Sequence, residues 1–127
     1  MIFSSVMRTG IKIIDEQHQL LVDLVKDFEH AINENMDDLF VEETLEELIN
    51  YVSYHFKAEE ELMAHNNYPD FNHHKEKHDE LVKKVIDFHE RFKRKELNLE
   101  KEILCFLKDW IVNHITKSDM KYVPYIN

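Results

Sequence analysis

The sequence is poor in the residues that make turns, with one glycine and two prolines among its 127 residues. That scarcity argues against folds built from many short strands, and it favours long helices joined by few loops. The single cysteine excludes an internal disulfide and fits a reducing compartment. No apolar run approaches the roughly 20 residues that a membrane helix requires, and the first residues lack the regions typical of a signal peptide. We therefore expect a cytoplasmic protein without membrane insertion.

Positive charge is scarce as well. Lysine and arginine are outnumbered by acidic residues, 16 against 26, which gives a net charge of −10. A field of that sign repels nucleic acid and anionic lipid surfaces, so neither is an expected partner. Hydrophobic residues make up 43% of the chain, which is enough to bury a core. The length suits one domain and no linker divides it, so we expect residues 1–127 to form a single domain.

Four stretches of the chain carry apolar residues at helical spacing. They span about 15–35, 38–66 and 69–95, and a fourth runs from about 98 past 114. Asp15 is expected to cap the first helix, and Pro69 suits the first turn of the third. Short connections between such long helices predict an all-α fold, an antiparallel up-down-up-down four-helix bundle. Residues 1–14 are expected to form an irregular N-terminal arm.

Two of these helices carry polar residues inside their apolar stripes. In the second helix the stripe runs through positions 41, 45, 48, 52, 55, 59 and 62, which places His55 and Glu59 among core residues. In the third, positions 71, 74, 78, 81, 85, 88 and 92 place His74 and His78 in the same way. Residues four apart lie about 40° apart around a helix, so each pair faces one direction.

The first and fourth helices each add one histidine. His18 lies three residues before Leu21, and His114 lies one turn after Trp110. Five imidazoles and at least one carboxylate are therefore expected to face one another inside the bundle. Each costs about 1–3 kcal/mol if it is buried without a partner. Together they would rival the whole stability of a domain, about 5–15 kcal/mol. A bound cation that ligates these groups removes the cost, so the sequence predicts a metal site.

Spacing alone would not identify these residues, because His30 and Glu34 also stand four apart. His30 lies five residues after Val25, about 140° away around the helix, so we expect this pair to be solvated. The other histidines expected at the surface are His65, His73 and His89.

The residues His18, "HFKAE" from His55 to Glu59, "HKEKH" from His74 to His78 and "HITKSD" from His114 to Asp119 resemble the ligand signature of the hemerythrins. The similarity is greatest to the single-domain bacterial branch, the bacteriohemerythrins. It extends to "GIKIIDEQHQLL" and "DWIVNHI", and thus covers nearly the whole chain. Phe3 is a departure, since bacterial members often carry tryptophan there.

The resemblance implies a centre of two iron ions (Fe2+/Fe3+) joined by an oxo or hydroxo bridge. The implied ligands are His18, His55, Glu59, His74, His78, His114 and Asp119. Both carboxylates would bridge the irons, three histidines would complete one iron, and His18 and His55 would hold the other. That second iron keeps an open position, where the family binds dioxygen as hydroperoxide.

Asp119 is the ligand that helical geometry supports least. It lies five residues after His114, which corresponds to about 140° on a regular helix. Both side chains can reach one centre only if the fourth helix bulges or ends between them. A single π-type turn would suffice, and such turns are frequent at functional sites.

The resemblance implies reversible dioxygen binding, as a carrier, store or delivery protein whose recipient is unknown, and no enzymatic activity. The sequence supports this over an oxygenase, because the Glu-x-x-His motifs of ferritin-like di-iron proteins are absent. Alternatives are an oxygen or redox sensing module, an enzyme acting on peroxide or nitric oxide, and iron sequestration.

Three apolar residues near His114 are candidates for the wall of an oxygen pocket, although plain core packing is favoured: Trp110, Ile111 and Ile115. Cys105 lies next to Phe106, a residue of the apolar stripe of the fourth helix. It is expected to be a buried packing residue rather than a redox group.

Overall fold

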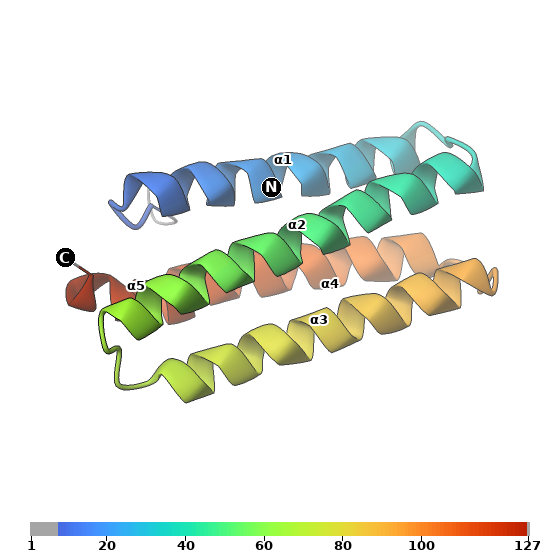
Figure 1. Ribbon diagram of the computed structural model, residues 1–127. Helices are drawn as coiled ribbons and strands as arrows, with labels where there is room; N and C mark the ends of the chain where they lie inside the picture. Colours follow the sequence, from blue (N-terminus) through green and yellow to red (C-terminus); the bar gives the residue numbers. More distant parts are fainter. Residues whose placement is uncertain (1–7, 127) are drawn as a thin grey trace.

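The protein is a four-helix bundle in a computed structural model that describes residues 8–126; Phe3 and the first half of the expected N-terminal arm, residues 1–7, lie outside the described residues. Four long helices run up, down, up and down with short connections (Figure 1). They are α1 (Lys12–Asn33), α2 (Asp38–His65), α3 (Phe71–Lys93) and α4 (Leu99–Asn113). Each packs against the next, and α4 closes the bundle against α1. The predicted fold class is confirmed.

The first helix begins earlier than the sequence suggested. It starts at Lys12, so the prediction that Asp15 caps it was wrong. Asp15 lies in the first turn, and its carboxylate accepts hydrogen bonds from the backbone N–H groups of Thr9 (2.7 Å) and Gly10 (3.1 Å) and from the Thr9 hydroxyl (2.8 Å). Asp15 therefore ties the segment before the helix to the first turn. An N-cap side chain would instead accept hydrogen bonds from the N–H groups of the first turn.

Asparagine replaces glycine at several helix ends. Asn35, Asn67 and Asn98 adopt positive φ angles of 53°, 54° and 58° in the connections between helices. Asparagine enters this left-handed region more readily than most residues, because its short polar side chain bonds locally. At the start of α2, the Asp37 carboxylate accepts a hydrogen bond from the Phe40 N–H (2.9 Å). The connections between the four long helices are thus built without glycine, since the single glycine, Gly10, lies before α1.

The apolar core fills the bundle around the helix midpoints and the end remote from the chain termini. Its fully buried members include Val25, Phe28, Leu45, Leu48, Val85, Phe88, Ile103 and Leu107. Two details differ from expectation. Met63 is buried where Leu62 was expected, and α4 turns so that Cys105 is exposed, which makes the prediction of a buried Cys105 wrong.

The chain continues beyond α4 in a different helical form. A π-helix, η2 (His114–Asp119), is followed by the short α5 (Met120–Tyr122) and a 3-10 turn, η3 (Val123–Tyr125). No helix within residues 8–126 combines the length and apolar character needed to cross a bilayer.

Candidate metal centre

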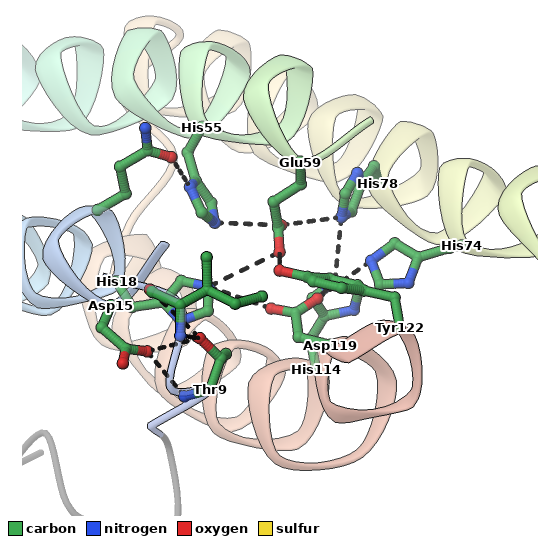
Figure 2. Close-up of polar contacts among 12 residues, drawn as sticks. Thr9, Asp15, His18, His55, Glu59, His74, His78, His114, Asp119 and Tyr122 are labelled. Carbon is green, nitrogen blue, oxygen red and sulfur yellow. Dashed lines mark hydrogen bonds and ion pairs between the residues drawn. The ribbon is translucent and has the colours of Figure 1, made fainter. Parts of the chain in front are cut away.

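The bundle brings the seven predicted site residues into one buried cluster (Figure 2). His18 comes from α1, His55 and Glu59 from α2, His74 and His78 from α3, and His114 and Asp119 from η2. Each is at most 5% exposed. Five imidazoles and two carboxylates thus occupy an interior position that apolar side chains would otherwise fill.

The π-helix is what joins the last two residues to the cluster. Residues five apart are hydrogen-bonded neighbours in a π-helix, whereas in an α-helix they point about 140° apart. The described turn spans His114–Asp119, so both side chains reach the same place, with His114 Nε2 3.0 Å from Asp119 Oδ1. The expectation that the fourth helix bulges or ends here is confirmed, and the bulge takes the π form that would suffice.

The donor atoms fall into two overlapping sets. One contains Glu59, His74, His78, His114 and Asp119, and the other contains His18, His55, Glu59 and Asp119. Within each set the donor atoms all lie within 4.8 Å of one another, and both carboxylates belong to both sets. The arrangement is one of two adjacent cation positions sharing two carboxylates, one position having five residues around it and the other four.

The separations between donor atoms suit metal coordination. His55 Nε2 lies 3.1 Å from Glu59 Oε1, His74 Nε2 lies 3.0 Å from Asp119 Oδ1, and His18 Nε2 lies 3.2 Å from Asp119 Oδ2. Neighbouring ligands of an ion at about 2.1 Å lie roughly 3 Å apart, and opposite ones about 4.2 Å. Imidazole with carboxylate is a donor mixture that suits iron and other first-row transition metals.

Two outer contacts fix which nitrogen of a histidine faces the cluster. His55 Nδ1 lies 2.6 Å from the Gln17 side-chain oxygen, and His78 Nδ1 lies 2.9 Å from Glu60 Oε2. Both partners accept hydrogen bonds, so each Nδ1 donates and a neutral ring presents its Nε2 lone pair inward. Metal-ligating histidines carry this kind of outer partner.

Without a cation, these inward lone pairs have poor partners. His78 Nε2 lies 3.0 Å from His114 Nε2 and 3.5 Å from Glu59 Oε1, and both of those atoms are acceptors unless protonated. Buried atoms without a hydrogen bond at the cluster are Nδ1 and Nε2 of His18, Nε2 of His74, Oε1 of Glu59 and both carboxylate oxygens of Asp119. Unpaired buried polar groups are costly, and a cation between them removes the cost.

The charges within the cluster are strongly interdependent. Burial opposes ionisation of His18, but the Asp119 and Glu59 carboxylates outweigh it and raise the pKa of His18 to about 9. Burial likewise opposes ionisation of both carboxyls, yet the surrounding imidazoles hold the pKa values of Glu59 and Asp119 below their usual range. Both carboxyls are therefore ionised at neutral pH and face the imidazoles, as expected of a cation site.

The family model for the hemerythrin HHE cation binding domain matches residues 9–126. The chain belongs to the hemerythrin family. The bacteriohemerythrin of Methylococcus capsulatus is 36% identical over 120 residues, which cover 94% of this chain and 90% of that protein. A hemerythrin-like protein of Naegleria gruberi is 36% identical over 109 residues, covering 86% of this chain and 79% of its own. A crystal structure of wild-type hemerythrin matches at a TM-score of 0.89 and 34% identity, covering 98% of this chain and 95% of that one.

Aromatic rings cover part of the cluster in this hemerythrin. Phe56 stacks on His78, with ring centroids 3.7 Å apart, and Trp110 stacks on His114 at 4.3 Å. Trp110 and His114 also line a surface hollow of about 490 Å³, so Trp110 forms part of the wall between the cluster and solvent. Ile111 and Ile115 lie in the apolar core, as the favoured interpretation expected.

Sequence reasoning missed three residues of the hemerythrin cluster: Gln17, Glu60 and Tyr122. The Tyr122 hydroxyl is fully buried and donates a hydrogen bond to Glu59 Oε2 (2.6 Å). Burial and the negative charges of Glu59 and Asp119 raise the pKa of Tyr122, so it remains a donor. Gln17 and Glu60 are sequence neighbours of the predicted residues His18 and Glu59. Each, however, accepts a hydrogen bond from a histidine on another helix. No periodicity within one helix contains that information.

Proposed function

We propose that the seven residues hold two iron ions with an oxo or hydroxo bridge, and that the protein binds dioxygen reversibly as a carrier, store or delivery protein. The whole chain, residues 1–127, would then be one oxygen-binding domain. The buried cluster of histidine, glutamate and aspartate is compatible with a di-iron site, and relatives are named bacteriohemerythrin. Cys105 is free and exposed, which suits the reducing cytoplasm, where we propose that the protein acts.

The inequality of the two donor sets carries this proposal. Five residues surround one position and four surround the other, and both sets include both carboxylates. A shared bridging oxygen would bring the first ion to six ligands and the second to five. The vacancy would lie on the side of His18 and His55, where dioxygen would bind. Two ferrous ions, one in each donor set, would together supply the two electrons that dioxygen binding requires.

The surrounding residues would keep the centre in place and dry. Gln17 and Glu60 orient His55 and His78 through their Nδ1 atoms, which maintains the inward direction of Nε2. Tyr122 holds the Glu59 carboxylate by its Oε2. Since every donor residue is at most 5% exposed, bulk water has little access to the reacting side chains.

The donor set favours a carrier over an enzyme. Five neutral imidazoles donate less charge to the irons than the carboxylate-rich shells of ferritin-like di-iron proteins. We infer that such a centre pushes less electron density into the O–O bond, so that release without cleavage is favoured. This inference follows from the ratio of the ligand types, which is five histidine nitrogens to two carboxylates.

Repeated oxygenation tests the proposal. The ferrous protein is mixed anaerobically with one equivalent of dioxygen and then purged with inert gas, while its optical spectrum is recorded. A carrier recovers its full ferrous spectrum over many cycles. Steady consumption of dioxygen, peroxide or nitric oxide with a supplied reductant would instead indicate an enzyme, and a spectrum that never responds to dioxygen would contradict the proposal.

A further inference from the structure

One buried polar atom outside the cluster resembles those within it. Among the residues that the structure describes, the buried side-chain nitrogen and oxygen atoms without a hydrogen bond belong to five residues. Four are His18, Glu59, His74 and Asp119 of the metal centre, and the fifth is His89, through its Nε2. Sequence reasoning placed His89 at the surface, yet its side chain is only 17% exposed.

Two carboxylates stand beside that nitrogen. His89 Nε2 lies 3.4 Å from Glu42 Oε1 and 3.2 Å from Glu46 Oε1 without making a hydrogen bond to either. Glu42 and Glu46 stand four apart on α2, and His89 lies opposite them on α3. The two helices are neighbours in the bundle (Figure 1). The three donor atoms lie within 4.8 Å of one another, the same limit that the two donor sets of the metal centre satisfy.

The charges of this trio are unbalanced. Like charges four residues apart on a helix repel each other, and Glu42 and Glu46 have ion pairs within residues 8–126 only with His89. A neutral imidazole leaves the group at −2, and a protonated one leaves it at −1. A divalent cation would neutralise both carboxylates and use the imidazole nitrogen at the same time.

We propose that Glu42, Glu46 and His89 bind a divalent transition-metal cation such as Zn²⁺, at a third site that is independent of the di-iron centre. One imidazole nitrogen and two carboxylate oxygens are donors that Zn²⁺ and its first-row neighbours accept in proteins. The exposed fractions of the glutamates, 23% and 48%, leave room for water to complete the coordination. The ion would clamp α2 to α3.

The third site is well separated from the first two. Glu46 precedes His55 by nine residues on α2, and His89 follows His78 by eleven residues on α3. At 1.5 Å per residue these intervals correspond to roughly 14 and 16 Å along the helices. None of the three residues belongs to the di-iron cluster, so the site can be emptied or altered while that cluster stays intact.

Zinc titration of the iron-loaded protein tests the proposal. Calorimetry, followed by gel filtration and metal analysis, should find one Zn²⁺ bound per chain with the iron content unchanged. His89→Ala should weaken zinc binding more than tenfold, and Glu42→Gln, which preserves size, should weaken it as well. The matched control is His30→Ala, because exposed His30 on α1 stands four residues before Glu34, which is also exposed and follows the helix directly. This variant should bind zinc like the parent protein.

Three results would overturn the third site. They are the absence of zinc binding beyond the iron already present, zinc that enters only by displacing iron, and unchanged zinc affinity in His89→Ala. The iron spectrum of each variant reports whether it has folded. Because that spectrum and the oxygen cycles depend on the di-iron cluster alone, failure of the third site and failure of the proposed function are distinguishable.

Discussion

The two ends of the same bundle are held together by different forces. Around Leu45, Phe88 and Ile103 the four helices meet through apolar side chains that are at most 1% exposed, and their burial alone favours folding. Around Glu59 and Asp119 the same helices meet through imidazoles and carboxylates, several of which lack hydrogen bonds. The comparison indicates that apolar burial holds one end together without a ligand, whereas the unpaired polar groups of the other end would be satisfied by the proposed cations.

Removing the iron should produce the largest difference between the two ends. Reduction and chelation should lower the free energy of unfolding by about 4 kcal/mol or more, the linkage expected for one ligand at a thousandfold its dissociation constant. Amide hydrogen exchange should accelerate at 114–119 and 55–59, while amides near Leu45 and Phe88 retain their protection. Acceleration spread evenly along the helices would contradict the proposed division.

Replacing a single proposed ligand should have an effect nearly as large. His74→Ala should lose one iron or both, because it removes a buried donor that lies 3.0 Å from Asp119 Oδ1. The matched control is His73→Ala, because within residues 8–126 the exposed His73 imidazole pairs only with Asp70. Metal analysis of both variants checks the prediction, and two irons with normal oxygen binding in His74→Ala would refute the assignment.

A core substitution at the apolar end should act on stability without acting on metal binding. Leu45 is fully buried, so Leu45→Ala should cost about 2–5 kcal/mol in urea unfolding while both irons remain bound. Leu39→Ala, at a position on the same helix that is 65% exposed, should change stability by less than about 0.5 kcal/mol. Iron loss from a folded Leu45→Ala protein would show that the ends are coupled.

The smallest expected effect is the loss of stability when one hydrogen bond to a proposed ligand is removed. Tyr122→Phe removes the hydroxyl that donates to Glu59 Oε2, a bond to a charged group worth about 1.5–3 kcal/mol. The iron should remain, with lower stability in denaturant titrations of the loaded protein. Tyr125→Phe is the control, since Tyr125 is 46% exposed. Equal stability of the two variants would contradict the claim that the Tyr122 hydroxyl stabilises the centre through Glu59.

The sequence predicted features that depend on position along one helix. The steps of three and four residues located the stripes, and the same steps placed His55, Glu59, His74 and His78 inside them. The five-residue interval from His114 to Asp119 required the fourth helix to bulge or end, and the structure contains a π-type turn, one of the forms that suffice. In each case the helix converts sequence spacing directly into direction.

Features that depend on how helices meet were not predictable in this way. Gln17 reaches a histidine 38 residues away, and Tyr122 reaches a glutamate 63 residues away. The exposure of Cys105 depends on how α4 is rotated against its neighbours, which buries Leu107 and Ile111 and leaves Phe106 only partly buried. Likewise His89 looks like a surface residue until α2 places two glutamates beside it.

Anaerobic titration of the metal-free protein with ferrous iron tests the central claim most directly. If buried imidazoles and carboxylates form two adjacent positions that share Glu59 and Asp119, binding should saturate at two ferrous ions per chain and restore the lost stability. Saturation at one ion, or a metal-free protein that is as stable as the loaded one, would contradict the account.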